Sequence, residues 1–274
     1  MAISLEHPCN RRREAARVGA PGAGLPTSPA LGGPRARASS ATPLPRSARL
    51  AGALALLAAA LAGCDPVVEG NGVYGEERRT GLAPFVGIHA ESGVEVTLTA
   101  GAASQSVVVS GDRNLLPYID TDVLGEDGRA VLRVRVSTAF TGTFRPRAVV
   151  EVLAAERALA REASKVVVKQ ATAPEFVAAA DQGSTIVLSG PSAGTAAGAT
   201  LRATLAGASQ LEATGYEVSE GASVDLRAGS VAKIRSDGPV TGTVVGGSEL
   251  HNEGPGTCEL VLADGASTVT CPGP

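Results

Sequence analysis

The sequence predicts an all-β protein whose exported part is a parallel β-helix, that is, a β-solenoid with short Gly/Ser turns. Apolar and polar residues alternate along short segments such as 94–99, which is the period of a β-strand. Small-residue turns recur about every 20 residues in the C-terminal half, as stacked coils require. The chain has only four Phe and three Tyr, and stacked Val, Ile, Leu and Ala can fill a narrow solenoid bore instead.

The N-terminal segment differs from the rest of the chain. Residues 1–45 are rich in Arg and Pro without apolar periodicity, which predicts a disordered leader or a start codon placed too far upstream. Residues 46–63 have the order of a signal peptide, because Arg46 and Arg49 precede the apolar run 50–62. That run is shorter than the roughly 20 residues that span a bilayer, so an exported chain is favoured over a transmembrane helix.

The apolar run ends in Leu61-Ala62-Gly63-Cys64, which resembles a bacterial lipobox. The resemblance implies cleavage between Gly63 and Cys64 and lipidation of Cys64, so the membrane becomes a partner through the anchor. The alternative is a buried helix that ends by chance in Gly-Cys. We expect a cell-envelope protein at the outer membrane or cell surface. The periplasmic side of a membrane is the alternative, since Asp65 resembles an inner-membrane retention signal in some bacteria.

Cleavage before Cys64 would leave 211 residues with 16 basic and 25 acidic side chains, a net charge near −9. Such a charge argues against nucleic acid as a partner. In an oxidising compartment Cys258 and Cys271 are the remaining pair, and we expect them to form a disulfide. Two geometries fit: a two-residue hairpin turn at 264–265 that places them opposite each other, or a coil turn at 265–267 that they flank.

Residues 64–80 contain three glycines and a charged run, which predicts a tether, and residues 81–274 form the predicted β-helix domain. Segments 94–99, 107–109, 131–136 and 149–152 have strand character. Segment 153–164 competes, because its Ala, Leu, Glu and Arg content favours a helix by propensity, although three valines follow directly.

The repeat in the C-terminal half is carried by turns that contain or precede a serine. The serines are spaced by 20, 25, 21, 18 and 19 residues and are Ser164, Ser184, Ser209, Ser230, Ser248 and Ser267. A coil of this length returns the chain above its previous position with like residues in register. The period is the basis for the parallel β-helix.

The chain resembles the bacterial head GIN domain family, known as auto-transporter adhesin heads by analogy of fold. The resemblance runs from about residue 72 to the C-terminus. Its carriers are segments 85–88, 92–98, 112–116, 119–123 and the later Gly-Ala-Ser repeats up to 246–248. It implies a right-handed parallel β-helix and no catalytic residues. Segments 153–164 and 190–198 depart from the family pattern, the second by a lengthened turn.

Few motifs in the sequence could carry chemistry. Gly190 to Gly194 fits the G-x-S-x-G pattern around Ser192, but Gly and Thr follow where a nucleophile elbow needs a helix, so a turn is favoured. His89 and His251 have no Cys/His spacing that indicates a metal. The sequence therefore predicts no catalytic residue, no metal site and no cofactor.

Charged and aromatic residues leave two further hypotheses. Calcium could bind among Asp120, Asp122, Glu126 and Asp127, although a solvated acidic stretch is the commoner meaning of such a run. The alternating arginines could grip an anionic envelope polymer, although paired arginines on a solvated strand face are commoner; they are Arg133, Arg135, Arg145 and Arg147. Tyr118 near a turn is interpreted as structural.

These observations favour a lipid-anchored envelope protein with a non-catalytic β-helix that presents a binding or adhesion face to an envelope polymer or a protein ligand. The alternative is a structural spacer without a dedicated ligand, which an exposed apolar stripe would argue against. A third hypothesis, an enzyme acting on polysaccharide, needs carboxylates at one stacked position. Glu212, Asp225 and Asp237 do not share a repeat phase.

Overall fold

The computed structural model describes residues 67–191, 198–262 and 264–272. The predicted leader, the signal peptide, Gly63 and Cys64 lie outside these residues. The predicted all-β class is confirmed, since the described part consists of strands and one short 3-10 helix, η1 (Arg113–Tyr118). No helix in this part of the chain has the length and apolar character needed to cross a membrane.

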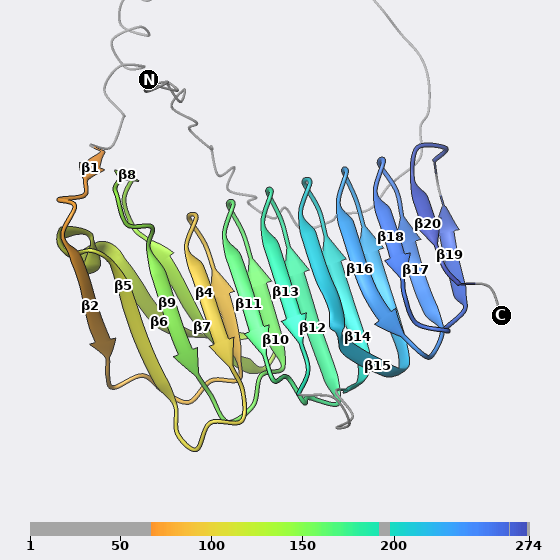
Figure 1. The fold of residues 1–274 in the computed structure, drawn as a ribbon, viewed down its shortest axis with the longest axis horizontal. Coiled ribbons are helices and arrows are strands. Elements are labelled where there is room, and N and C mark those ends of the chain that lie inside the picture. Colours follow the sequence, from red (N-terminus) through yellow and green to blue (C-terminus); the bar gives the residue numbers. More distant parts are fainter. Residues whose placement is uncertain (1–66, 192–197, 263, 273–274) are drawn as a thin grey trace, which may run out of the picture. The chain divides into compact units, whose positions relative to one another are not determined.

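The strands form two faces that run side by side from β2 at one end to β20 at the other (Figure 1). One face, here called the groove face, stacks in the order β6 (Ile119–Glu126), β7 (Arg129–Val136), β3 (Gly87–Ala90), β10 (Arg157–Ala160), β12 (Glu175–Ala180), β14 (Gly198–Leu205), the second half of β15 (Gln210–Leu226), β17 (Val240–Val244) and β19 (Cys258–Leu262).

The other face, here called the valine face, stacks in the order β2 (Tyr74–Arg79), β5 (Ser106–Asp112), β9 (Arg147–Glu151), β4 (Glu95–Thr99), β11 (Lys165–Lys169), β13 (Thr185–Ser189), the first half of β15, β16 (Val231–Ser236), β18 (Glu249–Asn252) and β20 (Thr268–Thr270). β1 (Val68–Glu69) pairs separately with β8 (Phe140–Thr141). Because β15 bends and belongs to both faces, all strands except β1 and β8 join in one 18-stranded sheet of the described residues.

The sheet is mixed. From β10 onward each strand pairs in parallel with the strand one coil later, as between Val166 and Ile186. The N-terminal part contains antiparallel pairs, β2–β5, β5–β9 and β6–β7. A parallel arrangement throughout is therefore not what the structure shows. The antiparallel strands β6 and β7 are joined by a hairpin turn at Asp127 and Gly128, both with positive φ, and an Asp-Gly pair is a strong signal for such a turn.

Two sequence-based boundaries change. Residues 74–79, placed in the tether, form β2 and pair antiparallel with β5. The strand was hidden because its outward residues are charged and its inward position is Gly75, so no apolar alternation appears. Segment 153–164, where helix and strand competed, contains β10 and a turn. Stacking between β3 and β12 outweighs helix propensity there.

The Gly/Ser turns build one edge of the coils. In most of them two residues with positive φ reverse the chain, for example Gln182 (φ 60°) and Gly183 (φ 72°), and a buried serine follows. Serines of neighbouring coils are linked, since the Oγ of Ser209 accepts the N–H of Ser184 at 3.3 Å. Glycine is favoured at these positions because side chains resist positive φ, and serine because only a small side chain fits the corner.

The core between the faces is narrow. Between β3 and β14 many inward positions of the groove face carry alanine, whereas the inward positions of the neighbouring valine-face strands carry larger residues. The alanines are Ala90, Ala158, Ala160, Ala178, Ala180 and Ala203, and the larger residues are Val96, Leu98, Val166, Val168, Ile186 and Leu188, all buried. Small against large side chains fills much of the gap at close packing, so that few aromatic residues are needed.

A buried carboxylate closes the N-terminal end. Asp112, fully buried at the end of β5, accepts the N–H of Gly72 at 2.7 Å and that of Phe144 at 3.0 Å. Asn114 adds a bond from its amide to the carbonyl of Glu69 at 2.7 Å. Segment 112–116, which carries part of the family resemblance, therefore fastens the first strands to the coil.

The C-terminal end is closed by a disulfide. Cys258 on β19 and Cys271 just after β20 are joined, with their Cα atoms 6.3 Å apart, as the sequence predicted. β19 and β20 pair in parallel with the previous coil on opposite faces, so the cysteines flank a coil turn at 265–267 and the hairpin alternative is wrong. Asp264 accepts the N–H of Ser267 at 2.9 Å in that turn. The bond thus links the two faces at the last coil.

Replacing Cys258 by Ser is expected to lower the melting temperature of the oxidised protein, because a cross-link over 13 residues stabilises by about 3 kcal/mol. The β-type circular dichroism should remain, since the other coils keep their ladders. Reduced wild type is the matched control and should melt like Cys258→Ser. Equal melting of oxidised wild type and the variant would show that the bond contributes nothing.

Candidate binding faces

A row of β-branched side chains crosses the outside of the valine face. Strand register aligns one outward residue from each of five adjacent strands: Val108, Val149, Thr97, Val167 and Val187. We call this set the valine row. Val149 is 50% exposed and the other four are partly exposed. At about 4.8 Å per strand the row is about 19 Å long, an apolar ribbon on a solvent-facing sheet.

Charged residues border the valine row on both sides. On one side Arg147 forms an ion pair with Glu95 at 3.3 Å, and Lys165 lies next to Glu95 on β11. On the other side lie Glu151 and Lys169. An apolar centre with a charged rim is the composition of a protein-binding surface.

Beyond β13 the same row becomes polar. Glu212 on β15 lies 3.9 Å from Lys233 on β16, and His251 on β18 follows in register. Glu212 and Lys233 form an ion pair between strands, whereas His251 pairs with Glu249 on its own strand. The valine face is therefore divided into an apolar N-terminal half and a charged C-terminal half.

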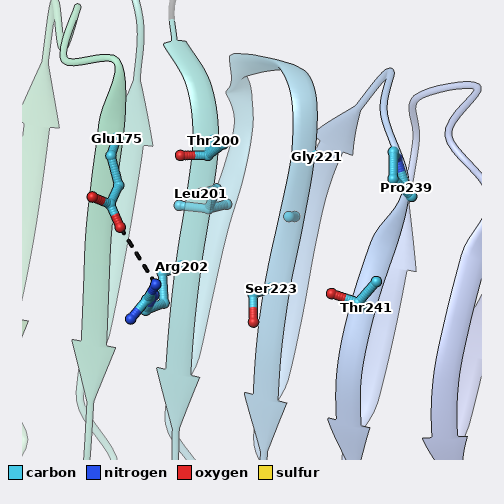
Figure 2. Close-up of a pocket in the computed structure, with 9 residues that line it drawn as sticks. Glu175, Thr200, Leu201, Arg202, Gly221, Ser223, Pro239 and Thr241 are labelled. Carbon is cyan, nitrogen blue, oxygen red and sulfur yellow. Dashed lines mark ion pairs between the residues drawn. The ribbon is translucent and has the colours of Figure 1, made fainter.

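The groove face carries a shallow depression of about 300 Å³ over β12, β14, β15 and β17. Figure 2 shows Glu175, Arg202, Ser223 and Thr241 lying on these four neighbouring strands. Arg202 forms an ion pair with Glu175 at 3.6 Å. The depression thus offers one carboxylate, one guanidinium and the hydroxyl groups of Thr200, Ser223 and Thr241, which can hydrogen-bond a polar ligand.

The bend of β15 shapes this depression. Gly221 has a φ of +147°, and a Cβ there would lie 2.6 Å from the carbonyl oxygen of Pro239. Below the surface Tyr216 is fully buried, packs against Phe176 with ring centroids 5.8 Å apart, and donates to the carbonyl of Ala173 at 3.0 Å. These two aromatic residues belong to β12 and β15 and are among the largest fully buried side chains of the described residues.

Comparison with known protein families matches residues 84–256 to the family described as "Putative auto-transporter adhesin, head GIN domain". The chain belongs to this family. Two crystal structures resemble the head GIN domain, both of proteins described as putative adhesins. The one from Bacteroides fragilis has a TM-score of 0.51 and 9% identity over 74% of this chain and 98% of its own. The one from Parabacteroides merdae has a TM-score of 0.50 and 14% identity over 75% and 98%.

At these identities the structural likeness establishes the fold alone. A search of curated proteins finds no match to the chain. The family match therefore places this head GIN domain among adhesin-like proteins of the cell envelope or exterior, and the particular binding surface has to be argued from its own residues.

The acidic residues considered for calcium are engaged by cations of the domain. Arg133 bonds Asp122 at 2.8 Å and Arg135 contacts Asp120 at 3.3 Å. Glu126 accepts from His89 at 2.8 Å, and Asp127 bonds Arg157 at 2.5 Å. Each carboxylate thus has a protein partner, and no group of three metal-ligating side chains occurs within the described ranges. A calcium ion at these carboxylates would have to displace the cationic side chains that they contact.

The arginines proposed to grip a polymer are distributed over both faces. Arg133 and Arg135 lie on the groove face and pair with β6, and the hydrogen bond to Asp122 raises the pKa of Arg133 above its ordinary value. Arg147 lies on the valine face against Glu95, and Arg145 is exposed in the loop before it. They do not form one cationic surface.

The two histidines differ. His89 is 4% exposed on β3, with Nδ1 bonded to Glu126 and Nε2 lying 3.0 Å from Glu91, outside hydrogen-bonding geometry. His251 lies at the surface, 3.6 Å from Glu249. His89 on β3 therefore holds the end of the β6–β7 hairpin through its bond to Glu126, which is a structural role.

The remaining sequence candidates are placed as follows. Ser192 lies outside the described residues. Tyr118 is 38% exposed at the end of η1. Glu212 is on the valine face, Asp225 on the groove face beside Arg227 at 2.7 Å, and Asp237 in a loop. Sequence reasoning missed the valine row and the depression, because both depend on which strands become neighbours.

Replacing Tyr216 by Phe is expected to make the free energy of unfolding fall less steeply as the pH rises above 10. Burial raises the pKa of Tyr216 to about 12, whereas in the unfolded chain it is about 10. Above pH 10 the unfolded state therefore releases a proton that the folded state keeps, and stability falls by about 1.4 kcal/mol per pH unit up to pH 12.

The measurement is urea unfolding between pH 9 and 12. Tyr118→Phe, at an exposed position, is the matched control and should follow wild type. An identical pH slope for Tyr216→Phe and wild type would show that Tyr216 ionises alike in both states. Loss of the bond to Ala173 should lower stability by about 1 kcal/mol at every pH.

Proposed function

We propose that this head GIN domain is the exported, lipid-anchored part of a cell-envelope protein that binds a partner through the valine row without catalysis. The valine row is the observation that carries the proposal. A flat apolar ribbon of this size on a solvent-facing sheet costs solubility, and such surfaces mark interaction sites. Its charged border would fix orientation, while the β-branched side chains lose little conformational freedom on contact.

The partner that suits this surface is a protein or an extended polymer with an apolar strip. Lys165 and Lys169 lie on β11 on either side of Val167, so acidic residues at the edge of the partner's binding surface would complement them. The hydroxyl groups and the Glu175–Arg202 pair of the depression are a second, polar contact region on the opposite face. Affinity spread over many strands suits adhesion better than uptake of one small ligand.

The anchor and the coil are parts of the same proposal. The lipobox-like segment ending at Cys64 lies three residues before the first described residue, which suits a domain suspended directly from a membrane. From β10 onward we propose a right-handed parallel β-helix. The regular parallel register and the near-20-residue serine period support it. Outer membrane or cell surface is the location that suits an adhesin best.

The two alternatives are less well supported. A spacer without a ligand needs no apolar row, and charged or small residues would serve better at Val149 and Val167. An enzyme acting on polysaccharide needs carboxylates free to act as acid and base. Two of those on the groove face are in ion pairs, Glu175 with Arg202 and Asp225 with Arg227.

The anchor is tested by labelling cells with a palmitate analogue. Wild type should incorporate the label, fractionate with membranes and be accessible to added protease, whereas Cys64→Ala should carry no label. Cys9→Ala, with its cysteine in the predicted leader, is the matched control and should label like wild type. Label in the Cys64→Ala chain, or none in wild type, would overturn the lipid anchor.

The binding face is tested with the double variant Val149→Lys, Val167→Lys. Two cations in the apolar row should reduce retention of chain-bearing cells on immobilised mucin, peptidoglycan and lipopolysaccharide at least tenfold, without change in melting temperature because both side chains face solvent. Thr243→Lys on the groove face is the matched control. Undiminished retention of the double variant would exclude the valine row, and no retention of wild type on any surface would favour the spacer.

A further inference from the structure

The N-terminal end of the domain exposes apolar side chains that the binding face does not explain. Val67 is 55% exposed, Val73 46%, Tyr74 48% and Phe144 36%. Tyr74 and Phe144 form an edge-to-face pair with ring centroids 5.5 Å apart. We call these four residues the end patch. Val67 precedes β1, Val73 lies between β1 and β2, Tyr74 begins β2, and Phe144 lies in the loop after β8. β1, β2 and β8 lie at one end of the stack (Figure 1).

The end patch is held rigidly. Asp112 fixes Gly72 and Phe144 from below, and the carbonyl of Val73 accepts the N–H of Arg113 at 2.7 Å. The hydroxyl of Tyr74 donates to Glu76 at 2.5 Å, so the ring is oriented with its polar tip toward a charged side chain. An amphipathic ring fixed with one wet and one apolar side is the arrangement that aromatic residues adopt at membrane interfaces.

Exposed charges surround the patch. Arg113 follows Asp112 and lies against Gly75, and Arg145 follows Phe144, both exposed. Glu69 and Glu76 are the acidic neighbours. Arginine beside exposed aromatic and aliphatic residues suits a surface of anionic headgroups over acyl chains.

We infer that the end patch rests on the phospholipid surface to which the chain is anchored, so that the domain stands on the membrane instead of swinging from a flexible tether. The inference depends on the proposed lipidation of Cys64. Three peptide steps separate Cys64 from Val67, and a fully extended chain covers about 10 Å in that distance. A lipidated Cys64 would thus hold the patch within the interfacial layer, where its apolar side chains leave water.

This placement orients the binding face. On the valine face nine strand spacings separate β2 from β20, about 43 Å at 4.8 Å each. With the β2 end on the membrane the strand ladder rises away from it, and the valine row lies in the half nearer the bilayer. The disulfide-closed coil points outward.

The chain contains no tryptophan, so a single substitution introduces a unique fluorophore. The full lipidated protein carrying Phe144→Trp is reconstituted into vesicles of phosphatidylcholine and phosphatidylglycerol, with or without bromine on the acyl chains. We expect blue-shifted emission that bromine quenches at least twofold. Val261→Trp, 63% exposed on the last coil, is the matched control and should emit as in water without quenching.

Flotation of the vesicles separates the two proposals. Wild type that floats with vesicles while Cys64→Ala does not supports the anchor. If the anchored Phe144→Trp protein floats but its emission matches that of Val261→Trp, the membrane contact of the end patch is excluded while the anchor stands. If wild type does not float, the anchor fails, and the inference that rests on it fails as well.

Discussion

The structure depends on the register between neighbouring coils. In the C-terminal half a strand pairs in parallel with the strand of the same face in the previous turn of the chain, as β12 does with β10 and β13 with β11, and a small residue recurs at the same corner. At the corner the small residue is a serine, as where the N–H of Ser184 bonds to the Oγ of Ser209. In the narrow core it is an alanine, as where Ala178 pairs in register with Ala203. Once the inward positions are set by stacking, the outward residues are aligned in rows whether or not a row has a use.

Because outward residues of neighbouring strands are aligned, residues of one type on several strands form a continuous surface. One valine on a strand face is unremarkable, but five aligned β-branched residues make an apolar ribbon, and charged residues in register make the ion pairs that border it. The same geometry explains why the acidic residues near β6 do not form a cation site: antiparallel pairing places Arg133 opposite Asp122 and Arg135 opposite Asp120. Pairing satisfies their charges inside the sheet.

The strands and turns of the C-terminal half could be predicted because their signals are local and periodic: a strand, two residues that tolerate positive φ, and a serine. The disulfide could be predicted because Cys258 and Cys271 are the pair that remains after the proposed cleavage. The N-terminal part could not. β2 lacks the apolar alternation of a strand because its residues include Glu76, Glu77 and Arg78. Its partner β5 lies well beyond it in the chain, with Arg79 opposite Val107 and Tyr74 opposite Asp112. The valine row was equally inaccessible, since its residues stand in the chain order 97, 108, 149, 167, 187 but in the spatial order 108, 149, 97, 167, 187.

A stack of coils has two ends, and each exposes unpaired strand edges that would invite association with another chain. This domain closes them differently. At one end antiparallel strands and the buried Asp112 build a rigid cap with aromatic residues on its surface, and at the other a disulfide ties the last coil across its two faces. A disulfide suits the end that projects into solvent, because the bond closes that end without contact to another molecule. Exposed apolar side chains suit the end that contacts another surface, and the proposed anchor at Cys64 would make the membrane that surface.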